Sequence, residues 1–126
     1  MASGASLDVV FRVEEVGEFR GVLKRYLAPM TFDSLVRQMP LSGALVVSGG
    51  LAYFQIGVKR GAEKEVRRVE PGDILYWPAL PALAIILEPT TPPSQSVKIG
   101  MLTDSPEPLK SARQGLRIVL EKATWT

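Results

Sequence analysis

The side chains best suited to recognising a ligand form an aromatic and amide cluster on two predicted strands. Tyr53 and Gln55 lie two positions apart in one segment, and Tyr76 and Trp77 are adjacent in another. Successive strand side chains point to opposite faces, so Tyr53 and Gln55 share one face while Phe54 lies on the other. Rings beside an amide can form a shallow apolar groove with one hydrogen-bonding group. We therefore predict a ligand-binding site made of Tyr53, Gln55, Tyr76 and Trp77.

A purely structural interpretation of the same cluster stays open. Tyr76 and Trp77 can instead close a barrel and bond their polar tips locally, because buried Tyr and Trp normally find such partners. Tyr53 and Gln55 can equally be ordinary surface residues of their strand. The choice depends on whether their face carries an open pocket.

Missing residue types exclude several kinds of chemistry. The chain has no Cys and no His, which excludes disulfides, thiolate nucleophiles, Cys/His zinc sites and imidazole-based triads. Ser42 has no base nearby, and Gly49–Gly50 is not followed by the Lys-Ser/Thr of a phosphate-binding loop. We therefore predict no catalytic residue, no metal site and no cofactor.

Length and composition predict one globular domain. The 126 residues are 46% hydrophobic and 22% charged, ordinary values for such a domain. We expect a tail over residues 1–6 and a single barrel domain over residues 7–126. Asn is absent and Gln occurs four times, which favours a heat-adapted source.

Charge and targeting patterns favour a cytoplasmic protein. The formal charge is only +2, and the densest basic stretch, residues 59–68, is interrupted by two Glu. Such a stretch is typical of a solvated hairpin, so nucleic acid is an improbable partner. The N-terminus lacks the basic and apolar regions of a signal peptide, and the longest apolar run, residues 79–87, is too short to span a bilayer. We expect no membrane partner.

Hydrophobic periodicity predicts a mainly β fold with two short helices. After Pro29, apolar side chains recur at helical spacing (Phe32, Leu35, Val36 and Met39), with Thr31 as the predicted N-cap. A second short helix is expected over 106–113, with Ser105 as its N-cap. Eight or nine short strands favour a closed barrel over an open sheet. The predicted strands cover residues 7–13, 19–27, 44–48, 51–58, 65–69, 74–77, 82–87, 97–102 and 116–122.

Several segments resemble the small prokaryotic cyclophilin-like proteins. Residues 70–78 (EPGDILYWP) and 82–90 (ALAIILEPT) resemble that family's G-D-x-x-Y-W-P and A-L-x-I-F-F-G-P-T patterns. Three shorter pieces, residues 28–31, 52–56 and 97–100, agree in order along the chain. The resemblance extends from Phe11 to Lys122 and implies a closed cyclophilin-like β-barrel of about eight strands, with a helix at each end.

The resemblance also implies where a catalytic group would lie. Cyclophilins isomerise X-Pro bonds, using an Arg that bonds the prolyl nitrogen and a Gln that fixes a substrate carbonyl. The Arg is expected within residues 44–49, where this chain reads Ala-Leu-Val-Val-Ser-Gly. Gln55 stands where the small family more often has Glu. Without its cation, an isomerase would lose most of the electrostatic stabilisation of its transition state.

These observations predict a non-catalytic barrel that binds a peptide or a small molecule. One alternative is a prolyl isomerase with an altered active site, in which Arg25, Arg37 or Arg113 reaches the groove from another element. A second alternative is a weak RNA-binding module, suggested by the pI of about 9.1. Its contacts would come from a group of basic residues: Lys59, Arg60, Arg67 and Arg68.

Overall fold

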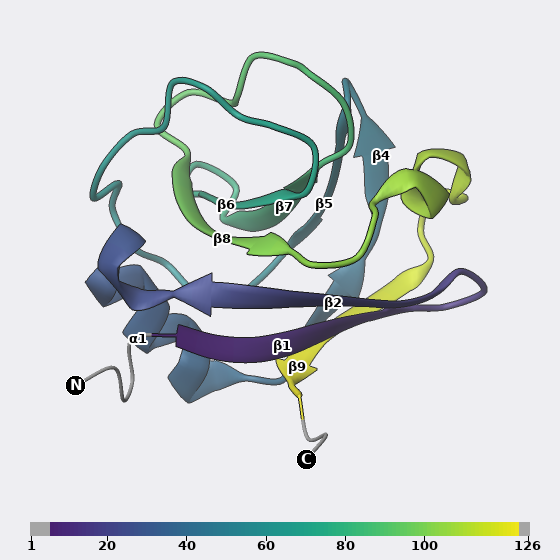
Figure 1. The fold of residues 1–126 in the computed structure, drawn as a ribbon. Coiled ribbons are helices and arrows are strands. Elements are labelled where there is room, and N and C mark those ends of the chain that lie inside the picture. Colours follow the sequence, from purple (N-terminus) through teal and green to yellow (C-terminus); the bar gives the residue numbers. More distant parts are fainter. Residues whose placement is uncertain (1–5, 124–126) are drawn as a thin grey trace.

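The computed structural model describes residues 6–123, which form a nearly closed antiparallel barrel of nine strands (Figure 1). This confirms the predicted mainly β fold. Residues 1–5 of the predicted tail lie outside the described residues. The strands are β1 Ser6–Val13, β2 Gly17–Lys24, β3 Leu41–Ala44, β4 Val46–Ser48, β5 Leu51–Gln55, β6 Asp73–Trp77, β7 Ala82–Ile86, β8 Val97–Leu102 and β9 Arg117–Lys122.

The sheet curls into a barrel because its two edge strands, β3 and β4, are consecutive in the chain and therefore lie next to each other. The strand order is β3-β9-β1-β2-β8-β6-β7-β5-β4, and only Leu45 separates β3 from β4. The Leu45 amide donates to the Leu116 carbonyl, and the Gly115 amide donates to the Leu45 carbonyl, each over 2.8 Å. We call the segment that contains β3, Leu45 and β4, residues 41–48, the seam of the barrel. Further along the seam, the Gln114 side chain binds both backbone groups of Val47. The predicted strand 44–48 is therefore the second half of a longer, bent strand.

The barrel interior is the main core, and strand alternation determines which side chains enter it. Phe54, Ile56 and Val58 are buried inside as predicted, although β5 itself ends at Gln55. The Phe54 ring meets the edge of Phe11 from the opposite wall, with 6.5 Å between ring centroids. Tyr53 and Gln55 consequently face outward.

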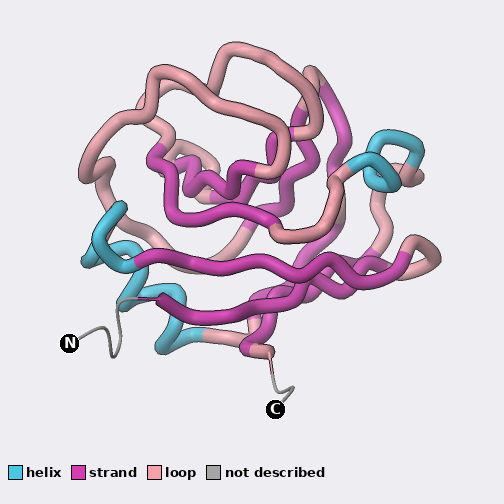
Figure 2. The backbone as a smooth tube through the Cα atoms, in the orientation of Figure 1, coloured by secondary structure: helices cyan, strands magenta, loops and turns pink. Residues whose placement is uncertain are grey.

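A second, smaller core lies outside the barrel wall. Leu75, Ala84 and Ile86 are buried on the outer side of β6 and β7, where Val66 and Val69 of the long loop 57–72 pack against them. Figure 2 shows such loops gathered over this side of the barrel. All of β7 is buried in consequence, as its continuous apolar sequence predicts.

The predicted strand over 65–69 is wrong. In this segment only Glu65 makes a bridge, to Val97, and the rest is loop. The apolar residues that suggested a strand cover the sheet from outside instead of joining it. For the same reason, the basic stretch 59–68 is a loop rather than a hairpin.

Helix α1 (Pro29–Gln38) and the 3-10 helix η2 (Glu107–Ser111) lie at opposite sides of the barrel (Figure 1). The predicted stripe of α1 is confirmed, since Phe32 and Leu35 are buried and Val36 and Met39 pack against the main core. Instead of the predicted helix over 106–113, the chain forms the shorter η2. Its N-cap is Pro106 rather than the predicted Ser105, although Ser105 Oγ accepts a hydrogen bond from the Glu107 amide. No helix within residues 6–123 is long and apolar enough to cross a membrane.

Two boundaries near α1 differ from prediction. The second strand stops at Lys24, because residues 25–27 form a 3-10 turn (η1, Arg25–Leu27). Thr31 is not the N-cap: the helix begins at Pro29, and Thr31 is buried in its first turn. The carboxylate of Glu63 accepts hydrogen bonds from the Met30 and Thr31 amides and from the Thr31 hydroxyl. A distant loop residue therefore satisfies the free amides that a local cap would otherwise bind.

Candidate ligand-binding groove

A groove of about 370 Å³ opens on the outer face of the barrel where β3, β4 and β5 meet. The loop between β6 and β7 forms one wall through Leu80. Two of the four side chains predicted as ligand-binding contribute to its surface. The complete lining is Ala44, Val46, Tyr53, Gln55 and Leu80.

Strand register and two glycine features bring these side chains together. Val46 pairs directly with Tyr53 across the β4–β5 ladder. The turn between these strands uses Gly49 and Gly50 at φ of +62° and +83°, values that side chains other than Gly rarely adopt. At Gly43 a Cβ would lie 2.8 Å from the Gln55 carbonyl oxygen. Its absence lets β3 approach β5, which places Ala44 beside Gln55.

The Tyr53 ring stands on Trp77. Their centroids are 5.2 Å apart with an interplanar angle of 65°, an edge arrangement that aromatic pairs favour. Both rings are half-buried. Trp77 does not line the groove itself; it supports the ring that does.

Gln55 joins the floor of the groove to its wall. Its Nε2 donates a hydrogen bond to the Leu80 carbonyl over 3.0 Å, and the side chain is exposed. No hydrogen bond to its Oε1 occurs within residues 6–123. That oxygen can therefore accept from a ligand.

Tyr76 serves the barrel and is remote from the groove surface. Its side chain is fully buried, and its hydroxyl donates to the Val58 carbonyl over 2.7 Å while accepting from the Arg60 amide over 2.8 Å. Burial raises the pKa of this hydroxyl above its ordinary value, although the Arg60 hydrogen bond and charge oppose the shift. For Tyr76 the geometry matches the structural interpretation of the sequence.

No charged side chain lines the groove. Arg25 forms a two-bond ion pair with Asp33, and Arg113 pairs with Glu15, so both are engaged elsewhere. These pairs lower the pKa of the Asp33 and Glu15 carboxyls, chiefly through the hydrogen bonds from the guanidinium groups. Arg37 is not among the lining residues. Within residues 6–123, no cluster of three acidic side chains could hold a metal ion.

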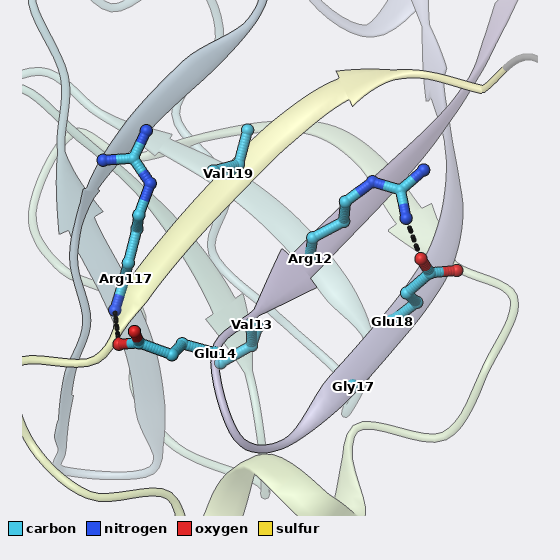
Figure 3. A pocket seen from close by; sticks show the side chains of 7 residues that line it. All are labelled: Arg12, Val13, Glu14, Gly17, Glu18, Arg117 and Val119. Atoms are coloured by element: carbon cyan, nitrogen blue, oxygen red, sulfur yellow. Dashed lines mark hydrogen bonds and ion pairs between the residues drawn. The ribbon is translucent and has the colours of Figure 1, made fainter.

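A second cavity, of about 320 Å³, lies on the outer face of β1, β2 and β9 (Figure 3). Arg12 crosses it and pairs with both Glu18 and Glu121. Glu14 accepts a hydrogen bond from the Arg117 amide at its other side. This cavity could not be predicted from the sequence, because its residues come from opposite ends of the chain. Its lining is Arg12, Val13, Glu14, Gly17, Glu18, Arg117 and Val119.

Comparison with known proteins gives one family and two structural relatives. A family model described as Cyclophilin-like matches residues 8–121. The hypothetical protein AF2241 from Archaeoglobus fulgidus superposes with a TM-score of 0.79 at 25% identity, over 94% of this chain and 96% of that one. McbB, solved in complex with tryptophan, shares the fold with a TM-score of 0.72 at 15% identity. That match covers 94% of this chain but only 45% of McbB. No curated protein matches.

Proposed function

Because the chain belongs to the cyclophilin-like family, and its barrel carries an open groove, we propose that it is a non-catalytic barrel that binds a peptide or a small molecule. The observation that carries this proposal is the groove itself. It brings Tyr53 and Gln55 to one concave surface, with the apolar side chains of Val46 and Leu80 beside them. An apolar surface with few convergent polar groups is the usual character of a ligand site.

The dimensions of the groove suit a small ligand. Its volume of about 370 Å³ lies near the lower end of ordinary ligand pockets, which begin at about 300 Å³. A protein that contains the same fold, McbB, has been solved in complex with tryptophan. This supports a ligand with the size of an amino acid or a short peptide.

The lining argues for binding rather than catalysis. Prolyl isomerisation must overcome the partial double-bond character of the peptide bond, which a cation at the prolyl nitrogen would reduce. The groove floor presents Ala44 and Val46 in the segment where the resemblance implies an Arg. We expect X-Pro peptides to isomerise at the buffer rate even at high protein concentration, as NMR exchange measurements would report. Acceleration above that rate would favour the isomerase.

RNA binding has less support. Lys59, Arg60, Arg67 and Arg68 lie in loop 57–72, and none of them lines the groove. Glu63 and Glu65 lie among them and bind backbone amides of other segments. Steeply salt-dependent RNA binding would overturn this view, because phosphate contacts release counterions.

Chemical-shift mapping tests the proposed function. We expect amino-acid and tripeptide libraries to perturb the Val46 and Tyr53 amides and the Gln55 side-chain amide of the ¹⁵N-labelled chain. Tyr53→Ala should weaken that binding about tenfold or more, since a ring dominates the contact surface. Tyr26→Ala is the matched control, because Tyr26 is 72% exposed and lies outside the groove. Perturbations confined to other faces would contradict the proposal.

A further inference from the structure

The groove is flanked on its β9 side by a positively charged residue. Ala44, which lines the groove, lies directly opposite Arg117 in the β3–β9 ladder. Directly opposed residues project their side chains from the same face, with Cβ atoms about 4.5–5.5 Å apart. Arg117 therefore leaves the barrel on the outer face, next to the edge of the groove.

The guanidinium of Arg117 is not committed to a partner in the described part of the chain. Glu14 binds the Arg117 backbone amide over 3.2 Å, and Figure 3 shows the guanidinium pointing away from that carboxylate. Arg12 on the same face differs, because it pairs with Glu18 and Glu121. Arg117 is exposed, so its charge is available to an anion from outside.

The outer face thus places three kinds of contact in one row: an apolar surface, an amide and a guanidinium. Trp77 pairs with Ala82 and Ala82 with Gln55, while Ala44, which lines the groove together with Gln55, pairs with Arg117. A Cβ at Gly43 would lie 2.8 Å from the Gln55 carbonyl oxygen, so β3 lies close to β5, and β3 pairs with β9 on its other side. An apolar group can rest on Tyr53 and Ala44 while an amide group bonds Gln55. A carboxylate would then reach the guanidinium.

We propose that the groove binds an apolar molecule carrying a carboxylate, and that Arg117 binds this carboxylate. The inference rests on the proposed ligand-binding function and names the chemistry of the ligand. A planar guanidinium suits a carboxylate because it can donate two parallel hydrogen bonds. A free acylated amino acid and the C-terminal residue of a peptide share this chemistry.

Paired acid and amide probes separate these two sources and test the role of the charge. The two acids are N-acetylphenylalanine and Ala-Ala-Phe. Each is compared with its own C-terminal carboxamide, and all four probes are titrated into ¹⁵N-labelled protein. We expect at least one acid to bind about tenfold more tightly than its amide, an effect of the size given by hydrogen bonds to charged groups. Preference confined to Ala-Ala-Phe identifies a peptide C-terminus as the source, whereas preference shown by N-acetylphenylalanine identifies a free amino-acid derivative.

Charge variants assign the preference to one residue. Arg117→Gln should remove the preference for acids while leaving amide binding unchanged, and Arg117→Lys should restore part of it. Arg37→Gln is the matched control, because Arg37 is an exposed arginine outside the groove, and it should keep the full preference.

One result would contradict only the role of Arg117, and another would contradict the proposed ligand-binding function as well. Equal binding of acid and amide at the Tyr53 and Gln55 resonances would overturn the assignment of Arg117 and leave the groove as a binding site. No perturbation of those resonances by any of the four probes would contradict the proposed binding of small amino-acid ligands itself, and with it the role of Arg117.

Discussion

Tyr53 and Tyr76 differ in how their hydroxyl groups are satisfied, and this separates a groove-facing ring from a structural one. Tyr53 is half-buried against Trp77, and its hydroxyl has no hydrogen-bond partner within residues 6–123. Tyr76 is fully buried and bonds the backbone of Val58 and Arg60. In the sequence both tyrosines are equally suited to binding, because the pattern shows that Tyr76 and Trp77 face opposite ways but not which of the two enters the barrel.

Removing the Tyr76 hydroxyl should destabilise the fold. Tyr76→Phe leaves the Val58 carbonyl and the Arg60 amide without their shared partner, which costs about 1–3 kcal/mol when such groups are buried. Urea denaturation would measure the loss. Tyr53→Phe is the control and should change the free energy of unfolding by less than about 0.5 kcal/mol. Equal losses in the two variants would count against this distinction.

Helix α1 shows how far local pattern predicts an element. Its apolar stripe was predictable because helical spacing is a local property, and Phe32 and Leu35 are buried accordingly. Its N-terminus was not, because the group that binds the first amides is Glu63, on a loop far along the chain. The same loop carries Val66 and Val69, whose apolar character wrongly suggested a strand. Tertiary packing decided both features.

The Glu63 cap makes the stability of the fold depend on pH. Partial burial alone would raise the pKa of the Glu63 carboxyl, but hydrogen bonds from Thr31 and Met30 outweigh it and lower the pKa below the ordinary 4.5. A carboxyl with a lowered folded pKa stabilises the fold above its unfolded pKa, and this stability is lost as the pH falls through the folded value. We expect Glu63→Gln to lower the free energy of unfolding at pH 7 by about 0.5–1 kcal/mol, because water screens this exposed cap.

Acidification should then erase the difference between Glu63→Gln and the parent chain. Denaturant melts between pH 7 and pH 3 would show the two curves converging below pH 4.5, near the ordinary value for this group. Glu70→Gln, an exposed substitution in the same loop, controls for the change in net charge and should run parallel to the parent. A gap for Glu63→Gln that persists unchanged to pH 3 would contradict the cap.

At the scale of the whole molecule, barrel closure builds the groove and places its charge. The seam joins β3 to β9 on one side of the chain and β4 to β5 on the other. This register sets Arg117 beside Ala44, although the two residues are far apart in sequence. The sequence shows only that residues 44–49 contain no Arg. The strands themselves were largely predictable, whereas the cross-strand neighbours depend on pairing, which local pattern does not determine.

Substitution of Gln114 would show whether the hydrogen bonds of the seam open one at a time or all together. Its side-chain Oε1 accepts from the Val47 amide over 2.9 Å, and its Nε2 donates to the Val47 carbonyl over 2.7 Å, as a neighbouring strand would. We expect Gln114→Ala to destabilise the fold by about 1 kcal/mol and to speed hydrogen exchange of the Val47 amide about tenfold. Gln38→Ala, at the exposed end of α1, is the control and should alter neither quantity.

The glutamate variant separates the two halves of this interaction. Gln114→Glu keeps an acceptor for the Val47 amide but loses the donor to its carbonyl, so the amide should stay protected while stability falls. The Leu45 amide, which bonds Leu116 by backbone alone, reports whether the opening spreads. If Leu45 keeps its protection in Gln114→Ala, the seam opens only at β4, beside Val46 of the groove. Unchanged Val47 exchange in that variant would show that the side chain does not close the barrel.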